Sequence, residues 1–191
     1  MSMNILLAQR RSALGLFAGL PEPRLDAYLV CALLDGSGLR VLEGLRLRVK
    51  DVDFVRWETT VRDGKGRKDR ATVLPAALHE PLQERLRRVR QQHEEDLRAG
   101  LGEAPLPDAL ARKYPNAARE WGWQWVLPAS SHRLDRRTGS RHRHHLHESV
   151  IQKAVHEAVR RADVAKPATP HTFRHYAGFR TIPGGARFMP T

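Results

Sequence analysis

The sequence predicts a mainly α-helical domain that carries a small three-stranded antiparallel β-sheet. Apolar residues recur at helical spacing over most of the chain, which has 191 residues of which 41% are hydrophobic. Two short segments, 55–62 and 70–74, instead alternate apolar and polar residues as strands do. We expect the third strand at 123–127, where Trp123 and Trp125 continue this alternation. The length is near that of one typical domain, so we expect one core.

Two predicted helices flank a glycine-rich turn in the first part of the chain. The first forty residues read as helical, with a break at Pro21 and Pro23 and the strongest signal over 24–34. The turn-forming run 35–38 ends that helix, and a short helix is predicted over 39–45. This order places a tight turn directly before Arg40.

The two strand segments are joined by a short run that is rich in glycine and positive charge. Gly64 and Gly66 alternate there with Lys65, Arg67 and then Lys68. Such a run between two strands predicts a basic hairpin tip.

The second half of the chain is predicted to be helical around one long polar loop. The loop, 130–147, holds five Arg and five His against one Asp, which favours a solvated segment. Thr169 is the predicted N-cap and Pro170 the first residue of the last helix. Further helices are predicted over 79–99, 106–114 and 148–163.

Composition restricts the class of protein. A net charge of +12 and a pI near 10.9 favour a polyanionic partner, most often nucleic acid. The single Cys31 excludes an internal disulfide, and its apolar surroundings predict a buried thiol. No apolar run approaches the length of a membrane span and the start lacks the order of a secretory signal, so we expect a cytoplasmic protein without a membrane partner.

Four side chains on defined local structures predict a phosphate site. Arg40 follows the glycine turn, Lys65 lies at the hairpin tip, and His171 and Arg174 share one helix face at spacing i, i+3. Two guanidinium groups, a lysine and a histidine can bind phosphate and move protons. Simpler interpretations also stand: His171 and Arg174 as a solvated pair, Lys65 as a surface residue, and Arg40 in an ordinary salt bridge with Glu43.

Four motifs in this order resemble the catalytic domain of the tyrosine recombinases. They cover residues from about Leu25 to His175 and are 36–45, 49–53, 64–70 and 169–175. The resemblance implies a mainly helical recombinase fold that breaks and rejoins DNA at attachment sites without a cofactor or metal.

The resemblance also implies a role for each residue of the phosphate site. Arg40 and Arg174 would clamp the scissile phosphate, and His171 would bind it and assist proton transfer. Lys65 would protonate the leaving 5′ oxygen. Glu43, one turn after Arg40, would orient that arginine as a supporting residue.

Residues 106–115 and the tryptophans that follow them resemble the extra segment of integron integrases. Folded single-stranded cassette sites are then a possible DNA partner, with tryptophans that either stack on unpaired bases or cover the core. The basic loop, with His142, His144, His145 and His147, favours phosphate contact over metal binding. The predicted DNA-binding residues are Arg67, Lys68, Arg70, Trp121, Trp123, Arg141 and Arg143.

The chain departs from the family pattern after His175. The run 176–191 lacks the motifs expected there, and Tyr28, Tyr114 and Tyr176 do not match the position of the nucleophilic tyrosine. We therefore expect a helical segment or linker over 1–24, a partial catalytic domain over 25–175 with an insertion at about 100–125, and an irregular tail over 176–191.

Three functional interpretations follow from this departure. The chain could be a recombinase that is truncated and inactive alone, a non-catalytic DNA-binding module, or a subunit that takes its tyrosine from a full-length integrase. A homo-oligomer is a further possible assembly. Loss of the terminal helices is expected to expose apolar surface beside Val155 and Val159 and to promote self-association.

Overall fold

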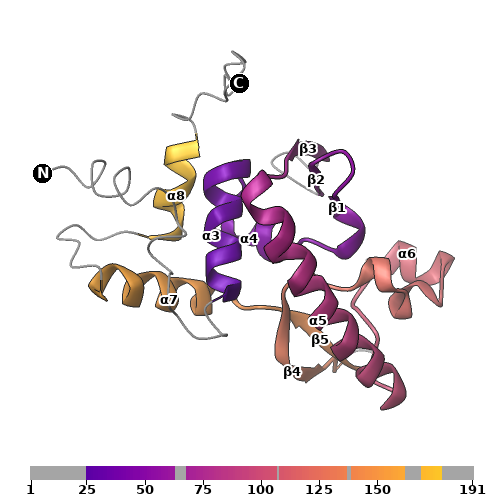
Figure 1. Cartoon of the computed structure of the whole chain (residues 1–191). Helices are drawn as coiled ribbons and strands as arrows, with labels where there is room; N and C mark the ends of the chain where they lie inside the picture. Colours follow the sequence, from indigo (N-terminus) through magenta and orange to yellow (C-terminus); the bar gives the residue numbers. More distant parts are fainter. Residues whose placement is uncertain (1–24, 63–67, 107, 137–138, 162–168, 178–191) are drawn as a thin grey trace, which may run out of the picture.

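The computed structural model describes residues 25–62, 68–106, 108–136, 139–161 and 169–177 (Figure 1). Its helices are α3 (Leu25–Ser37), α4 (Val41–Leu45), α5 (His79–Arg98), α6 (Asp108–Lys113), α7 (Glu148–Arg161) and α8 (Pro170–Ala177). Short 3₁₀ turns are η2 (Val49–Asp51), η3 (Ala76–Leu78), η4 (Ala117–Arg119) and η5 (Trp121–Trp123). The strands are β1 (Val52–Asp53), β2 (Glu58–Val61), β3 (Arg70–Val73), β4 (Pro128–Leu134) and β5 (Arg141–His145). The mainly helical fold with small antiparallel sheets is confirmed.

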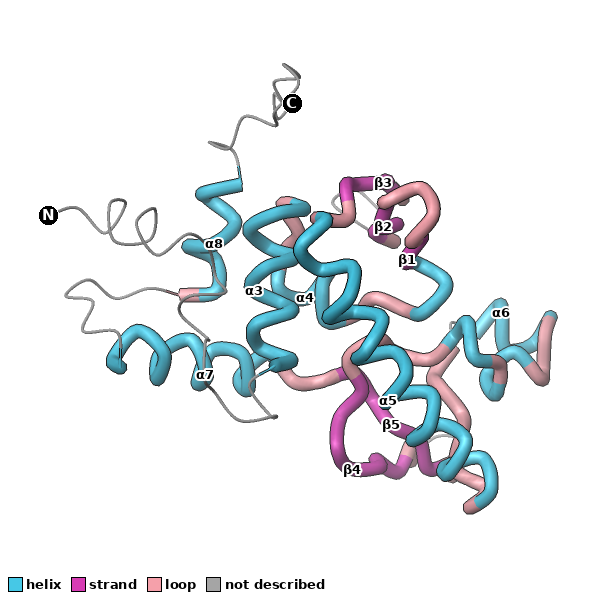
Figure 2. The backbone as a smooth tube through the Cα atoms, in the orientation of Figure 1, coloured by secondary structure: helices cyan, strands magenta, loops and turns pink. Residues whose placement is uncertain are grey.

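Helix α3 is the centre of the hydrophobic core. It is apolar on nearly all sides, a pattern that is typical of a buried helix. Helices α4, α7 and α8 and strand β3 all contact it, and α5 runs across the same body (Figures 1 and 2). Cys31 is fully buried on this helix, and burial raises the pKa of its thiol, as expected for a structural cysteine.

The first sheet has three antiparallel strands in the order β1-β2-β3, but its third strand is not the predicted one. Strand β1 pairs with β2 through Val52 and Thr59, so the edge comes from the segment before β2. The tryptophan segment 123–127 is instead irregular: Trp123 ends η5, and Trp125 makes one isolated bridge with Arg48. The expected strand was wrong because Arg48 holds this segment through side-chain contacts that a period of two does not reveal.

The segment 130–147 is a hairpin and not the predicted solvated loop. Strands β4 and β5 pair antiparallel from Pro128 with His145 to Leu134 with Arg141, with an irregularity between Pro128 and His132. The expectation failed because basic residues occupy both faces of these strands, so no apolar alternation marks them.

Residues Val155 and Val159 are 0% and 8% exposed, which contradicts the expectation that α7 presents bare apolar surface beside them. Helices α3 and α8 contact α7 and cover this side. Exposed apolar residues of the described chain include Val150 at the start of α7, at 38%, and, away from this helix, Val55 at 89% in the turn between β1 and β2 and Val73 at 53% on β3.

Two features are absent from the described residues. Within the described ranges, every helix falls short of the length and apolar character needed to cross a membrane. The same ranges contain no cluster of three His, Cys, Asp or Glu side chains that could hold a metal ion.

Candidate active site

Two glycines shape the turn that leads from α3 to the site. A side chain at Gly36 would meet the ring of Pro75, since an added Cβ would lie 2.3 Å from its Cγ. Gly38 has a φ of +65°, in the left-handed region that glycine adopts without strain. Thr72 of β3 donates its hydroxyl to the Ser37 carbonyl at 2.8 Å. The turn is therefore fixed between α3 and β3, and it delivers Arg40 to the surface.

Arg40 and Glu43 are linked at the start of α4. The Arg40 backbone N–H donates to Glu43 Oε2 at 2.8 Å, and Arg40 NH1 donates to Glu43 Oε1 at 3.0 Å. Glu43 thus binds the residue that precedes its helix, as an acidic N3 residue does in helix capping. The predicted supporting contact is present, and it coincides with the alternative of an i, i+3 salt bridge.

Arg70, at the start of β3, binds the same carboxylate. Its NH1 lies 3.1 Å from Oε1 and its NH2 lies 2.8 Å from Oε2 of Glu43, which makes a bidentate pair. The Glu43 side chain is 11% exposed, whereas the side chains of Arg40 and Arg70 are 41% and 38% exposed. Sequence reasoning predicted Arg70 only as a DNA contact, because its partner lies 27 positions away.

Helix α8 brings Arg174 to this group. Its start is fixed by Thr169 and Thr172: the Thr169 N–H donates to the Thr172 hydroxyl at 3.0 Å, which supports the predicted N-cap. Arg174 Nε then donates to the carbonyl of Gly38 at 3.1 Å, across 136 positions of sequence. The glycine turn therefore positions both arginines. Arg40 follows the turn in the sequence, and Arg174 is hydrogen-bonded to the carbonyl of Gly38 in the turn.

The pKa values reflect this grouping of charges. Burial raises the pKa of Glu43, but hydrogen bonds from Arg70 and Arg40 and the charge of Arg70 outweigh it and lower the pKa to about 2. Burial and then the charge of Arg40 lower the pKa of Arg174. Three guanidinium groups around one carboxylate leave an excess of positive charge that suits an anion.

The other predicted residues of this site fall into two groups. His171 is exposed on the first turn of α8, three positions before Arg174, and Lys68 is exposed just before β3. Lys65 and Arg67 lie outside the described residues.

The tyrosines of the chain take three different positions. Tyr28 is buried in α3, and Tyr114 follows α6 and is 50% exposed. Tyr176 lies on α8, and its side chain is outside the described atoms. Among the described side chains, no tyrosine belongs to the arginine group.

Arg48 fastens the segment 105–125 to the rest of the molecule. It donates to the carbonyls of Trp123 and, at 2.7 Å, of Pro105, and its guanidinium carbon lies 3.9 Å from the centroid of the Trp125 ring. Burial lowers the pKa of Arg48 to about 10, although Asp51 raises it. Sequence reasoning missed Arg48, since nothing in its local pattern marks a partner so distant.

Trp121 and Trp123 are half-buried beside basic side chains. Lys50 Nζ lies 2.8 Å from the centroid of the Trp123 ring. A groove of about 330 Å³ passes Trp121, where the Arg90 guanidinium carbon lies 5.9 Å from the ring centroid. Trp125, by contrast, is 8% exposed and belongs to the interior.

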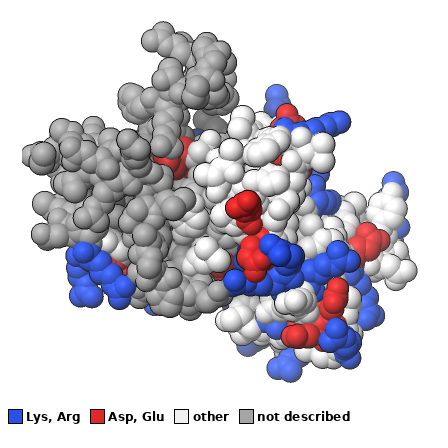
Figure 3. Space-filling model, in the orientation of Figure 1, with Lys and Arg blue, Asp and Glu red and all other residues white. Residues whose placement is uncertain are grey.

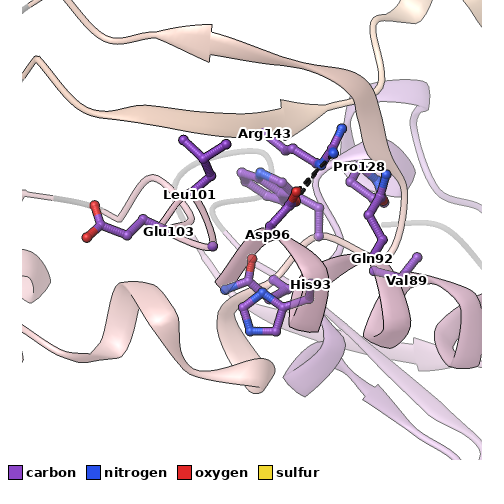
Figure 4. A pocket seen from close by; sticks show the side chains of 11 residues that line it. Val89, Gln92, His93, Asp96, Leu101, Glu103, Pro128 and Arg143 are labelled. Atoms are coloured by element: carbon purple, nitrogen blue, oxygen red, sulfur yellow. Dashed lines mark hydrogen bonds and ion pairs between the residues drawn. The ribbon is translucent and has the colours of Figure 1, made fainter. Parts of the chain in front are cut away.

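The hairpin β4–β5 is fastened to α5 by an ion pair. Arg143 binds Asp96 in a bidentate manner, with 2.6 Å from Nε to Oδ2 and 3.0 Å from NH2 to Oδ1 (Figure 4). The cavity there has about 20 Å³, which is room for little more than a water molecule. The structure therefore gives Arg143 an internal partner, whereas the other predicted contact of this hairpin, Arg141, is exposed.

His144 and His145 lie together against Trp125. Their ring centroids are 4.0 Å apart, and those of His145 and Trp125 are 5.4 Å apart. Burial lowers the pKa of both histidines, and the positive charge of neighbouring groups lowers it further. Both rings are therefore biased toward the neutral form.

Positive charge is not spread evenly over the surface. The face in Figure 3 carries basic side chains over the α5 region and near α7, with acidic side chains between them along α5. Arg87 and Arg88 pair there with Glu84, at 2.7 and 3.0 Å, and Arg90 lies 3.4 Å from Glu94. The arginine group around Glu43 differs in burial, because the side chain of Glu43 is 11% exposed whereas that of Glu84 is 40% exposed.

The chain is similar in sequence to known proteins over most of its length. A model of the phage integrase family matches residues 21–188. Proteins described as integrase/recombinase, from Escherichia coli and Pseudomonas aeruginosa, are each 48% identical over 147 residues, which is 77% of this chain and 44% of those proteins. The chain thus spans less than half the length of these curated relatives.

Solved structures show the same fold at low sequence identity. The XerA recombinase has a TM-score of 0.52 at 21% identity, with 93% of this chain and 48% of that chain covered. The Tn1549 transposon integrase, solved in complex with transposon right end DNA, has a TM-score of 0.53 at 18% identity, covering 89% and 50%. The XerH recombinase bound to palindromic difH substrate gives 0.52 at 19% identity, covering 90% and 39%.

Proposed function

The chain belongs to the phage integrase family, and we propose that it forms the phosphate-binding part of a site-specific DNA recombinase of the integron integrase type. The observation that carries this proposal is the joint placement of Arg40 and Arg174 by the glycine turn. Arg40 follows Gly38 and Arg174 binds its carbonyl at 3.1 Å, so two guanidinium groups converge from opposite ends of the chain.

In this proposal, the two arginines bind the non-bridging oxygens of the scissile phosphate. They stabilise the negative charge on the phosphoryl oxygens when a nucleophile attacks phosphorus. His171 shares the helix face of Arg174 and donates a hydrogen bond to the same phosphate. Lys65 gives a proton to the 5′ oxygen as its bond to phosphorus breaks. Glu43 holds Arg40 in place.

We also propose DNA as the partner of the surrounding basic and aromatic residues. Arg67, Lys68 and Arg141 contact backbone phosphates. Each contact releases about one counterion from the DNA and so makes the affinity more sensitive to salt. Structural neighbours with the same fold, among them the Tn1549 transposon integrase and XerH, were solved with DNA, which supports this proposal.

The integron type rests on the segment 105–125 and its tryptophans. Trp121 and Trp123 are half-buried, with the cations of Arg90 and Lys50 beside their rings, and we propose that unpaired bases stack on these two residues, with about 1 to 3 kcal/mol per base. Folded single-stranded DNA with extruded bases offers such partners, whereas a regular duplex does not.

We further propose that the 191-residue polypeptide binds DNA without cleaving it. Tyr28 is buried in the core and Tyr114 follows α6, and among the described side chains no tyrosine belongs to the arginine group. Residues 25–175 then act as a partial catalytic domain, and a nucleophile supplied by a full-length integrase can complete the site. Without such a partner, the same polypeptide is a DNA-binding module that does not catalyse recombination.

Binding to a folded single-stranded cassette site, compared with a scrambled hairpin of equal length, tests the proposal. We expect tighter binding to the folded site and a steep loss of affinity with added salt at both. Equal affinity for both hairpins would refute the integron type, and affinity that is independent of salt would refute phosphate binding.

A covalent-trapping assay on a suicide attachment site tests the claim about cleavage. We expect no protein–DNA adduct from the polypeptide alone. An adduct that disappears in Tyr176→Phe would overturn that claim. Adducts that form only when a full-length integrase is mixed in, with cleavage in mixed complexes, would support a nucleophile supplied in trans.

A further inference from the structure

We infer that Arg70 is a positioning residue, which locks Glu43 and through it sets the guanidinium of Arg40, and is not itself a DNA contact. The inference deepens the proposed function and rests on it, because the anion that Arg40 meets is a phosphate of DNA. The basic character of residues 67–70, taken alone, would instead make Arg70 a DNA contact.

The carboxylate of Glu43 is saturated by hydrogen bonds. Oε1 accepts from NH1 of Arg40 and NH1 of Arg70, and Oε2 accepts from the Arg40 backbone N–H and NH2 of Arg70, at 2.8 to 3.1 Å. An ionised carboxylate has about four such positions. Glu43 is therefore held from both sides, by its own helix start and by β3.

The two arginines use this carboxylate differently. Arg70 directs both of its terminal nitrogens to Glu43, so the end of its guanidinium that could grip a phosphate through both terminal nitrogens is already occupied by the carboxylate. Of the Arg40 side-chain nitrogens, NH1 makes the contact with Glu43, and the side chain is 41% exposed. Arg40 is thus placed to meet an anion while Arg70 fixes its support.

Strand β3 connects Arg70 to the glycine turn. Arg70 pairs with Val61 across β2 and β3, and Thr72, two residues on, binds the Ser37 carbonyl beside the glycine turn. Strand β3 therefore ties Glu43 to the turn that also receives Arg174, so a change at Arg70 is felt at the arginine group without direct contact with DNA.

A double-mutant cycle on DNA binding tests this inference with the full 191-residue chain. The variants are Arg40→Gln, Arg70→Gln and the pair, with Arg160→Gln as a matched loss of one exposed positive charge on α7. Because Arg70 acts only through Arg40, we expect Arg70→Gln to weaken binding about tenfold in the wild-type background and less than about twofold in the Arg40→Gln background. Arg160→Gln should give the same small change in both.

An equal weakening by Arg70→Gln in both backgrounds would overturn the inference, because it would reveal a direct contact with phosphate. Arg70→Lys is a second test that keeps the charge and loses the bidentate geometry. We expect it to bind as weakly as Arg70→Gln. Full rescue by lysine would show that charge alone matters and would contradict a positioning role. Arg70→Lys also replaces Arg70→Gln if the latter fails to fold by circular dichroism.

A measurement without DNA separates this inference from the proposed function. Titration with inorganic phosphate, followed by the NMR signal of the Arg40 Nε–H, reports the anion site directly. We expect binding in the wild type that weakens about tenfold in Arg70→Lys. If the wild type fails to bind DNA, the proposed function is refuted, and the phosphate titration still decides the role of Arg70: equal phosphate binding in both proteins overturns it.

Discussion

Arg70 and Glu43 form a bidentate ion pair that joins strand β3 to the first turn of α4, with nitrogen–oxygen distances of 3.1 and 2.8 Å. Arg40 completes the coordination of the same carboxylate. The pair connects a sheet edge to a helix start, and it explains how a five-residue helix can hold an arginine in a fixed direction.

The first prediction concerns stability at acid pH. The pKa of Glu43 is about 2 in the folded chain and near 4.5 when unfolded, so its contribution to stability is complete above pH 4.5 and is lost as pH falls toward 2. We expect the free energy of unfolding to fall by about 2 kcal/mol more in the wild type than in Glu43→Gln between about pH 5 and about pH 3. Urea unfolding at the two pH values measures this, and equal losses would refute it.

The second prediction concerns Arg48. Its replacement by leucine leaves the carbonyls of Trp123 and Pro105 without a donor and removes a cation over Trp125. We expect the free energy of unfolding to fall by about 3 kcal/mol. Arg48→Lys keeps the charge but cannot reach both carbonyls, so it should lose about half as much. Chemical denaturation measures both variants, and a loss below about 0.5 kcal/mol for leucine would contradict the role of Arg48 as a fastening.

The third prediction compares two helical glycines. Gly36→Ala places a methyl group 2.3 Å from Pro75 Cγ and should destabilise the fold by about 2 kcal/mol. In Gly44→Ala the nearest atom is Leu34 Cδ1 at 3.8 Å, an ordinary contact, so helix propensity should make the change neutral or stabilising. Melting temperatures distinguish the two, and a stable Gly36→Ala would show that the turn before Arg40 is not fixed by Pro75.

The fourth prediction concerns pH and the histidine pair. Burial keeps the pKa of His144 and His145 below 6.5, so folding favours their neutral forms and stability falls as pH drops below that value. A DNA phosphate beside them would raise both pKa values, and binding would then take up protons. We expect affinity for DNA to rise between about pH 7.5 and about pH 6 in the wild type and to change less in His144→Gln/His145→Gln. Equal pH dependence would place the DNA away from this hairpin.

The sequence predicts those parts of the structure that depend on local signals. Helix α3 follows from its continuous apolar residues, the turn from Gly36 and Gly38, and the helix start at Pro170 from its N-cap Thr169. Arg40 and Glu43 are one helical turn apart, so their spacing alone predicts the contact.

The parts that the sequence does not predict depend on distant partners. Arg143 and Asp96 are 47 positions apart, and their ion pair makes an apparently solvated segment part of a packed hairpin. Trp123 and Trp125 have strand spacing, but Arg48 holds one by its carbonyl and the other by its ring. In both cases one guanidinium decides the local structure, and its partner cannot be read from neighbouring residues.

The salt dependence of DNA binding in Arg174→Gln tests the central claim most directly, because Arg174 is joined to the site by its hydrogen bond to the Gly38 carbonyl. Affinity is measured over a series of salt concentrations for the wild type, Arg174→Gln and the control Arg160→Gln. We expect Arg174→Gln to bind at least about tenfold more weakly and to flatten the slope of log K against log salt by about one. The control should show only the small changes in affinity and in slope that follow from the loss of one exposed charge. Arg174→Gln with the slope and affinity of Arg160→Gln would contradict the assignment of the arginine group as the phosphate site.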